Sequence, residues 1–339
     1  MREIQAMVGQ VLGVPAHQTA VVAGSGTLAT EAALSSLLGP GDRAVVCVQG
    51  YFSQRLADVA KASGACVHIL EVPPGQASQP LALQQLLDEL GPVDLVAAVH
   101  GETATGVAND ILGLGQTAQA HGALFVVDCV STFGGYELSL DGPLDVVCGA
   151  GQKCLGAYAG LSPLGFSKRA MMRLASRTAT VHTWYGDLTA FVKDGQFVDY
   201  LFRVTGATVL MAPLHEALRR LLFEGVPAAA ARHAEQSLRL QNALEAQGWR
   251  FHQDQATRLN TLLVVQLPPD FDESSALRFL ANSYGLAPGK GMGSHEGKAW
   301  RIGVMAEHAQ PAVIDRVILA FADLRQHWVA GNFRQAPTA

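Results

Sequence analysis

Lys153 is the residue whose surroundings point most directly to chemistry. It lies in the glycine-rich segment CGAGQKCLGAYAGL, and no other residue between Asp145 and Lys168 carries a formal charge. An amine desolvated in such a segment has a lowered pKa and is a better nucleophile, as Schiff-base formation requires. Because surface lysines usually lie among polar neighbours, we predict that Lys153 is a reactive amine. Gln152 beside it is suited to donate a hydrogen bond to a phosphate oxygen.

Two further charged residues border apolar runs. Asp128 follows the run ALFVV. A carboxylate buried there is costly unless a cation or a strong donor meets it, and a protonated ring nitrogen would serve. A helix cap or a structural ion pair explains Asp128 about as well. Arg301 leads into an apolar segment in KAWRIGVMAE, and its planar guanidinium suits either a substrate carboxylate or a structural salt bridge.

The segment GSGT at residues 24–27 separates an apolar run from the helical pattern LATEAALSSLL. Backbone N–H groups at a helix start form an anion site, and the glycines let a phosphate approach the backbone. An ordinary turn with Thr27 as the N-cap is the alternative. The third glycine of a dinucleotide fingerprint is missing, as is an acidic residue at the right distance, which argues against a nicotinamide-dependent dehydrogenase.

The elements that position these residues are predicted by a series of apolar runs. Between about residues 20 and 166 the runs are TAVVAG, AVVCV, CVHIL, VDLVAAV, ALFVVD, DVVCGA and LSPLGF, separated by amphipathic stretches of helix length. Continuous apolar strands alternating with helices indicate a parallel sheet covered on both faces. Ligands bind at the carboxyl ends of such strands. The sequence therefore predicts a wound, mostly parallel α/β fold.

The pattern changes after residue 224. A long helical stretch, VPAAAARHAEQSLRLQNALEAQG, is followed by the strand TLLVVQL, a helix around SSALRFLANSYG and a glycine-rich loop. A closing helix has an apolar face made by Val313, Val317, Phe321, Leu324 and Trp328. We predict a large cofactor-binding domain at residues 1–224 and a smaller α/β domain at residues 225–339.

Composition narrows the class of protein. The 339 residues are 49% apolar and 16% charged, with a net charge of -5, and a surface so poor in charge favours a buried subunit interface. The sequence has no block of basic residues interleaved with aromatic residues, so we expect no nucleic-acid partner. No apolar run approaches the ~20 residues that span a bilayer, and no signal sequence is evident, so we expect a cytoplasmic protein. The five cysteines lack metal-ligand spacing, and no metal is expected.

Five motifs in one order carry a family resemblance. GSGT, HGETATG, VVDCVSTFGG, GQKCLG and WRIG resemble the fold-type I, class V aminotransferases, which use pyridoxal 5'-phosphate. The likeness extends from about residue 4 to 325 and is strongest to alanine-glyoxylate and serine-pyruvate aminotransferases. It implies transfer of an amino group from alanine, serine or a similar amino acid to a 2-oxo acid such as glyoxylate or pyruvate, by a ping-pong mechanism.

The resemblance also implies a role for each matching residue. Lys153 would hold the cofactor as a Schiff base and move a proton, and Asp128 would pair with the pyridine nitrogen. Arg301 would bind the substrate carboxylate. The other cofactor-binding positions would be Ser25, Gly26, Thr27 and Gln152 at the phosphate, Thr103 near the ring hydroxyl, and Phe52 and Val130 on opposite faces of the ring.

A homodimer with shared active sites is a further implication of the resemblance. In the family, a Tyr-x-x-Thr stretch of one subunit reaches the phosphate in the other. The matching residues 202–205 read FRVT, so the tyrosine hydroxyl is absent, Thr205 remains, and Arg203 is suited to compensate. The family's two prolines after the lysine are replaced here by Tyr158 and Ala159. Its N-terminal Pro-Gly-Pro segment has no counterpart, so we expect either a preceding segment or a differently built pocket wall.

Three other functions remain open on the sequence alone. An enzyme resembling 2-aminoethylphosphonate aminotransferase would use Lys290 and Lys298 to favour a doubly charged substrate. A class V lyase or cysteine desulfurase would place a histidine over the ring and use a mobile cysteine, whereas this sequence has Phe52 and no cysteine after Cys154. A catalytically silent binding protein of the same fold is the third, and the retained lysine, aspartate and arginine argue against it.

Overall fold

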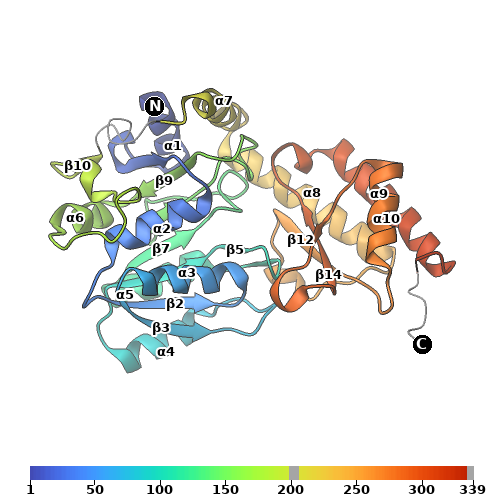
Figure 1. The fold of residues 1–339 in the computed structure, drawn as a ribbon, viewed down its shortest axis with the longest axis horizontal. Coiled ribbons are helices and arrows are strands. Elements are labelled where there is room, and N and C mark those ends of the chain that lie inside the picture. Colours follow the sequence, from blue (N-terminus) through green and yellow to red (C-terminus); the bar gives the residue numbers. More distant parts are fainter. Residues whose placement is uncertain (198–205, 334–339) are drawn as a thin grey trace.

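The structure is a computed structural model, and it describes residues 1–197 and 206–333. Its N-terminal part is built on a seven-stranded sheet with the order β1-β9-β8-β7-β4-β2-β3 (Figure 1). The strands are β1 (Thr19–Val22), β2 (Arg43–Val48), β3 (Cys66–Glu71), β4 (Leu95–Val99), β7 (Leu124–Asp128), β8 (Val146–Cys148) and β9 (Ser162–Phe166). Strand β9 is antiparallel to both of its neighbours, and the other six run in one direction. All seven apolar runs form these strands, and the predicted mostly parallel α/β fold is confirmed.

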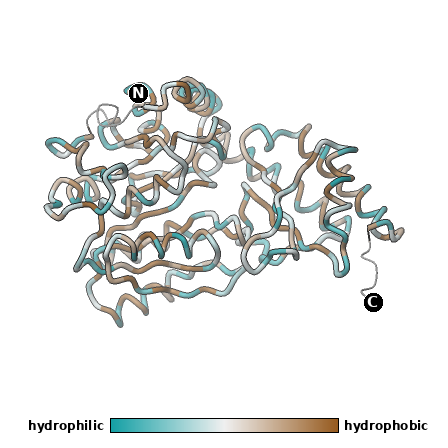
Figure 2. Tube along the Cα trace, in the orientation of Figure 1, coloured by the Kyte–Doolittle hydropathy of each residue, from teal (hydrophilic) through white to brown (hydrophobic). Residues whose placement is uncertain are grey.

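Helices cover both faces of this sheet because successive side chains of a strand point to opposite sides. On β2, Val45 and Cys47 pack with α1, α4, α5 and α7 on one face. Ala44 and Val46 pack with α2, α3 and α6 on the other face. The helices are α1 (Arg2–Leu12), α2 (Gly26–Leu37), α3 (Tyr51–Ala62), α4 (Pro80–Leu90), α5 (Ile111–Ala120), α6 (Lys168–Ser176) and α7 (Thr208–Glu224). Figure 2 shows the most hydrophobic stretches of chain running through this central sheet.

The C-terminal part lies to one side of the large sheet (Figure 1). It contains α8 (Val226–Ala246), α9 (Glu273–Tyr284), α10 (Pro311–Val329) and a three-stranded antiparallel sheet of β12 (Leu262–Gln266), β14 (Ala299–Gly303) and β13 (Gly289–Lys290). Its apolar core includes Trp300, and Val317, Phe321 and Leu324 of the predicted apolar face of α10. Gly225 ends α7 and begins α8. We therefore propose the division between residues 224 and 225 as a domain boundary.

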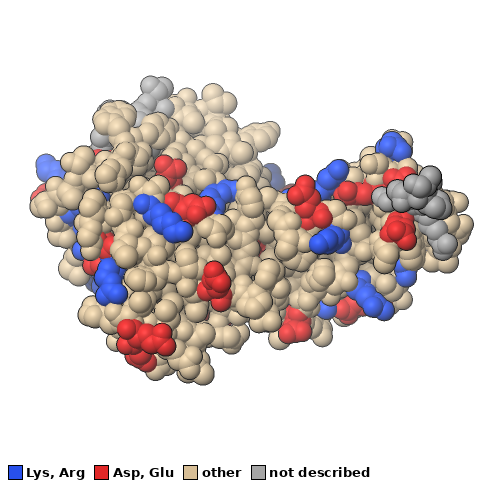
Figure 3. All heavy atoms as spheres, turned by 60° about the horizontal axis from the view of Figure 1, so that its bottom comes forward, with Lys and Arg blue, Asp and Glu red and all other residues tan. Residues whose placement is uncertain are grey.

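Two short strand pairs complete the described elements: β5 (Gly101–Glu102) with β6 (Val107–Ala108), and β10 (Val192–Lys193) with β11 (Gln196–Phe197). No helix within residues 1–197 and 206–333 is long and apolar enough to cross a membrane. On the face drawn in Figure 3, acidic and basic side chains are scattered among uncharged residues.

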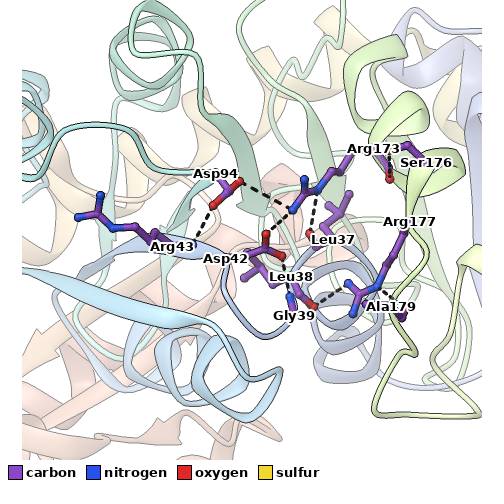
Figure 4. A network of polar contacts seen from close by, with 10 residues as sticks. All are labelled: Leu37, Leu38, Gly39, Asp42, Arg43, Asp94, Arg173, Ser176, Arg177 and Ala179. Carbon is purple, nitrogen blue, oxygen red and sulfur yellow. Dashed lines mark hydrogen bonds and ion pairs between the residues drawn. The ribbon is translucent and has the colours of Figure 1, made fainter.

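A polar network holds the amino-terminal edge of the sheet (Figure 4). Arg173 of α6 bonds Asp42 at 2.6 Å, and its Nη2 lies 3.8 Å from Asp94. The carboxylate of Asp94 in turn accepts a hydrogen bond from the backbone N–H of Arg43 at 2.8 Å. Because Asp42 and Asp94 directly precede β2 and β4, this network lies at the edge opposite the carboxyl ends of these strands.

Candidate active site

The carboxyl ends of parallel strands open into a cavity of about 210 Å³. Every site residue that the sequence predicts between positions 25 and 153 lines it. These residues are Ser25, Gly26, Thr27, Phe52, Thr103, Asp128, Val130, Gln152 and Lys153. They come from the start of α2, the start of α3, the turn between β5 and β6, the end of β7 and the loop after β8. The fold thus gathers residues that are far apart in the sequence.

Lys153 lies in the loop after β8 and faces this cavity. Burial lowers the pKa of its amine, and the positive charge of Arg301 lowers it further. The opposite influences of Cys154 and Asp128 are smaller. The loop therefore favours the neutral amine, which is the nucleophilic form.

Asp128 is the last residue of β7. Burial raises the pKa of its carboxyl to about 6, although the backbone N–H of Val130 donates to Oδ1 at 2.9 Å and acts in the other direction. The nearby Glu102 raises this pKa, whereas Arg55 and Lys153 lower it. Within the part of the chain that the structure describes, no cation forms an ion pair with Asp128. A cationic or strongly donating ligand group would stabilise its ionised form.

The start of α2 supplies an anion site in this cavity. The helix begins at Gly26 with Ser25 as N-cap, so Thr27 is not the cap, and the Ser25 side chain makes no capping hydrogen bond. The first N–H groups of a helix have no partner within it. A Cβ on Gly26 would lie 2.4 Å from Cγ2 of Val130, so only glycine allows this close packing. Oε1 of Gln152 is buried without a hydrogen-bond partner among the described residues.

Glu102 is a site residue that the sequence analysis did not single out. Its carboxylate is fully buried and accepts hydrogen bonds from the backbone N–H groups of Phe52 at 3.1 Å and Ser53 at 2.8 Å. It also accepts from the Ser53 hydroxyl at 3.0 Å and from the N–H of Ala104 at 3.1 Å. A carboxylate at a helix N-terminus is stabilised by the free N–H groups and the helix dipole. Glu102 therefore fixes the start of α3, and with it Phe52.

Arg55 is a second residue of the site that its sequence context did not reveal. It lines the cavity from α3, one turn after Phe52, and its Nη1 donates to Oγ1 of Thr27 at 2.8 Å. Its guanidinium carbon lies 5.0 Å from the centre of the Phe52 ring. A spacing of three residues places side chains on one face of a helix, and this spacing was the available signal in QGYFSQR.

The remaining predicted residues have different outcomes. Arg301 lies in β14 and does not line the cavity, but its charge acts on Lys153. Its Nε donates to the carbonyl oxygen of Lys290 at 2.8 Å, and no carboxylate within the described ranges forms an ion pair with it. Arg203 and Thr205 lie outside the described residues.

Comparison with known proteins decides the family. The family description "Aminotransferase class-V" matches residues 1–296. The chain belongs to the class V aminotransferases. A relative, the alanine-glyoxylate aminotransferase of Callithrix jacchus, is 33% identical over 315 residues, which cover 91% of this chain and 75% of the relative.

Solved structures agree with this placement. The alanine-glyoxylate aminotransferase from Nostoc sp. superposes with a TM-score of 0.87 at 31% identity, covering 96% of this chain and 86% of the other. The pyridoxamine-pyruvate aminotransferase from Mesorhizobium loti gives a TM-score of 0.90 at 26% identity, covering 97% and 84%. This class V aminotransferase therefore shares its fold with known transaminases, and the suspected family is confirmed.

Proposed function

We propose that this aminotransferase binds pyridoxal 5'-phosphate in the cavity and transfers an amino group from a small amino acid to a 2-oxo acid such as glyoxylate or pyruvate. The observation that carries this proposal is the convergence of Lys153, Asp128 and the start of α2 on one cavity. The names of the related enzymes include glyoxylate or pyruvate, and this supports a 2-oxo acid of that kind as substrate.

The chemistry of the cavity fits this cofactor in three places. The start of α2 and the side chain of Gln152 suit a phosphate group. Asp128, without a cationic partner in the described chain, suits a protonated ring nitrogen. Phe52 and Val130 line the same space and suit the two faces of a flat ring. Thr103 also lines it and has a hydroxyl suited to a polar substituent of that ring.

Each charged residue then has a chemical task. Pyridoxal phosphate, when bound, supplies an electron sink for the α-carbon of an amino acid. Lys153, whose amine has a lowered pKa, would hold the cofactor through its Nζ. As a free amine it would accept the proton from the substrate α-carbon as a general base and then donate it to a cofactor carbon as a general acid. Asp128 would keep the ring nitrogen protonated. Arg301 binds the substrate carboxylate, and this binding brings the α-carbon to Lys153.

We also propose that the enzyme is a homodimer with shared sites, in which Arg203 and Thr205 approach the partner's cavity. Support comes from large apolar side chains on the surface of the single chain. Tyr158 is 71% exposed, Val209 84% and Phe223 88%. Burial of such side chains in an interface removes apolar surface from water.

The desulfurase alternative needs a reactive, mobile cysteine. Cys154 is buried, and its thiol donates to the carbonyl oxygen of Ser131 at 3.2 Å. Burial raises its pKa to about 12. This thiol is therefore held in its unreactive form, which supports amino transfer over desulfuration.

A panel of amino donors and acceptors tests the proposed function. The protein loaded with pyridoxal phosphate is mixed with alanine, serine, cysteine or 2-aminoethylphosphonate, each with glyoxylate or pyruvate, and the keto product is measured. We expect turnover with alanine or serine. Sulfide release from cysteine, or turnover with 2-aminoethylphosphonate alone, would favour one of the alternative activities, and a protein without any turnover would favour the silent binding protein.

A further inference from the structure

Arg55 is a cation of the cavity wall that lacks a counter-ion. Its side chain is half-buried and lines the cavity, and no carboxylate in residues 1–197 and 206–333 forms an ion pair with it. Glu31 and Asp58 line a neighbouring hollow with Arg55, but neither is paired with it. The described structure therefore leaves this charge to be balanced by something else.

Three other partly buried arginines of the described chain are paired with carboxylates, although Arg301 is not. Arg173 bonds Asp42 at 2.6 Å, Arg232 bonds Glu224 at 2.6 Å, and Arg258 lies 2.7 Å from Glu245. A guanidinium that is removed from water loses favourable solvation free energy. A nearby anion compensates for this loss. Arg55 differs from these three in facing a cavity, where a bound anion can take the place of a carboxylate.

The position of Arg55 specifies which end of the cavity would hold this anion. Its Nη1 is hydrogen-bonded to Thr27 in the first turn of α2. The N–H groups of that turn and the Arg55 guanidinium therefore face one region. Helix dipole and guanidinium both favour negative charge there. The lowering influence of Arg55 on the pKa of Asp128 agrees with a guanidinium directed into the cavity.

We propose that Arg55 binds the phosphate group of the cofactor from within the same subunit and supplies the main positive charge at that group. This proposal rests on the proposed function, since it requires that pyridoxal phosphate occupies the cavity.

A purely structural role for Arg55 is the competing explanation. The guanidinium lies over the rings of Phe52 and Tyr51, at 5.0 and 5.2 Å from their centres. In this role Arg55 would only position Phe52 and Thr27. Loss of the side chain would then disturb the ring site and the phosphate site together. Two ligands that differ only in the phosphate separate the two roles.

The test compares pyridoxal phosphate with pyridoxal. Dissociation constants for both are measured by absorbance titration of the cofactor-stripped full chain, for the wild type and for Arg55→Gln, Arg55→Lys and the control Lys61→Gln. Lys61 is an exposed cation on the same helix. We expect Arg55→Gln to weaken pyridoxal phosphate binding by about 10- to 100-fold, as loss of a charge-assisted pair implies, and pyridoxal binding by less than about threefold. Arg55→Lys should give an intermediate loss, and Lys61→Gln none.

Each outcome decides the proposal. Equal losses for both ligands, or an unchanged affinity for pyridoxal phosphate, would overturn it. Pyridoxal binding and the circular dichroism spectrum report whether each variant is folded. If Arg55→Gln does not fold, the ratio of the two losses in Arg55→Lys decides. A wild-type chain that binds pyridoxal phosphate no better than pyridoxal would instead refute the proposed cofactor site, which is a separate result.

Discussion

The positive charge of Arg301 lowers the pKa of the Lys153 amine. Among the causes of this lowered pKa it ranks second, and only burial of the amine has a larger effect. The two residues come from the loop after β8 and from β14, on either side of the proposed domain boundary. A substrate carboxylate bound by Arg301 would neutralise its charge. The amine would then become more basic when substrate arrives, which suits an acceptor of the α-proton.

Substitution of Arg301 tests this relationship. Arg301→Gln should raise KM for the amino acid by about 10- to 100-fold, because a bidentate partner of the carboxylate is lost. Removal of the cation should also raise the pKa of Lys153. In the cofactor-free chain, the rate at which an amine reagent modifies Lys153 should therefore rise at a higher pH than in the wild type.

Lys298→Gln is the matched control for Arg301, because Lys298 is an exposed cation of the same region. It should leave both KM and the modification profile unchanged. A higher KM in Lys298→Gln, with Arg301→Gln unaffected, would contradict the role of Arg301 and favour a doubly charged substrate.

The raised pKa of Asp128 predicts that the wild type and Asp128→Asn differ in stability, by an amount that depends on pH, when no cofactor is bound. Its pKa is raised in the folded state from 3.8 to about 6, so the ionised carboxylate destabilises the fold. This cost is fully present above about pH 6 and disappears as the pH falls below about 4. Asp128→Asn should therefore increase the free energy of unfolding by about 1 to 3 kcal/mol at pH 7.5, and urea titration at pH 4 should show no gain.

The same variant should have the opposite effect on catalysis. Asp128→Asn lacks the negative charge that keeps a ring nitrogen protonated, so single-turnover proton removal should slow by at least about 100-fold. Cofactor retention, followed by absorbance after gel filtration, serves as the control. A near-normal rate would mean that Asp128 is only structural.

The network around Arg173 predicts an effect on stability without an effect on activity. Arg173→Met leaves Asp42 and Asp94 without their cation (Figure 4). We expect a loss of about 1 to 3 kcal/mol in the free energy of unfolding, measured by urea titration. Lys168→Met on the same helix removes an exposed lysine and should change it by less than about 0.5 kcal/mol. If Arg173→Met and Lys168→Met changed the free energy of unfolding equally, the network would not contribute specifically to stability.

Hybrid dimers test the proposed shared sites. Subunits with Lys153→Ala are mixed with subunits that carry both Arg203→Ala and Thr205→Ala. One site of each hybrid then keeps Lys153 and receives both donors from the partner, so activity should reappear from two impaired parents. Native mass spectrometry confirms that the hybrids form. Verified hybrids without recovery, or an active monomer in sedimentation, would exclude the shared site.

Some features of the fold are visible in the sequence and others are not. A strand buried on both faces leaves a continuous apolar run, so the seven strands were predictable. The antiparallel direction of β9 was not, because a short run such as LSPLGF has no feature that marks its direction. The exact start of α2 was also missed, since Ser25 and Thr27 are both good N-cap residues and the choice depends on packing of Gly26 against Val130.

The site shows the same limit. Residues at strand ends are found because polar side chains there contrast with the apolar run before them. Arg55 and Glu102 have no such contrast: one lies within an amphipathic helix and the other within a polar loop motif. Their importance depends on Thr27 and Phe52, which only the folded chain brings near.

Chemical trapping of the cofactor tests the central claim most directly. The protein is incubated with pyridoxal phosphate, reduced with borohydride, digested and mapped by mass spectrometry. Lys153 is the one lysine that lines the cavity in the described part of the chain, so we predict a single stoichiometric label on it, and none in Lys153→Ala. A label on Lys168 or Lys193 instead, or a protein that takes up no label and remains colourless, would contradict the account.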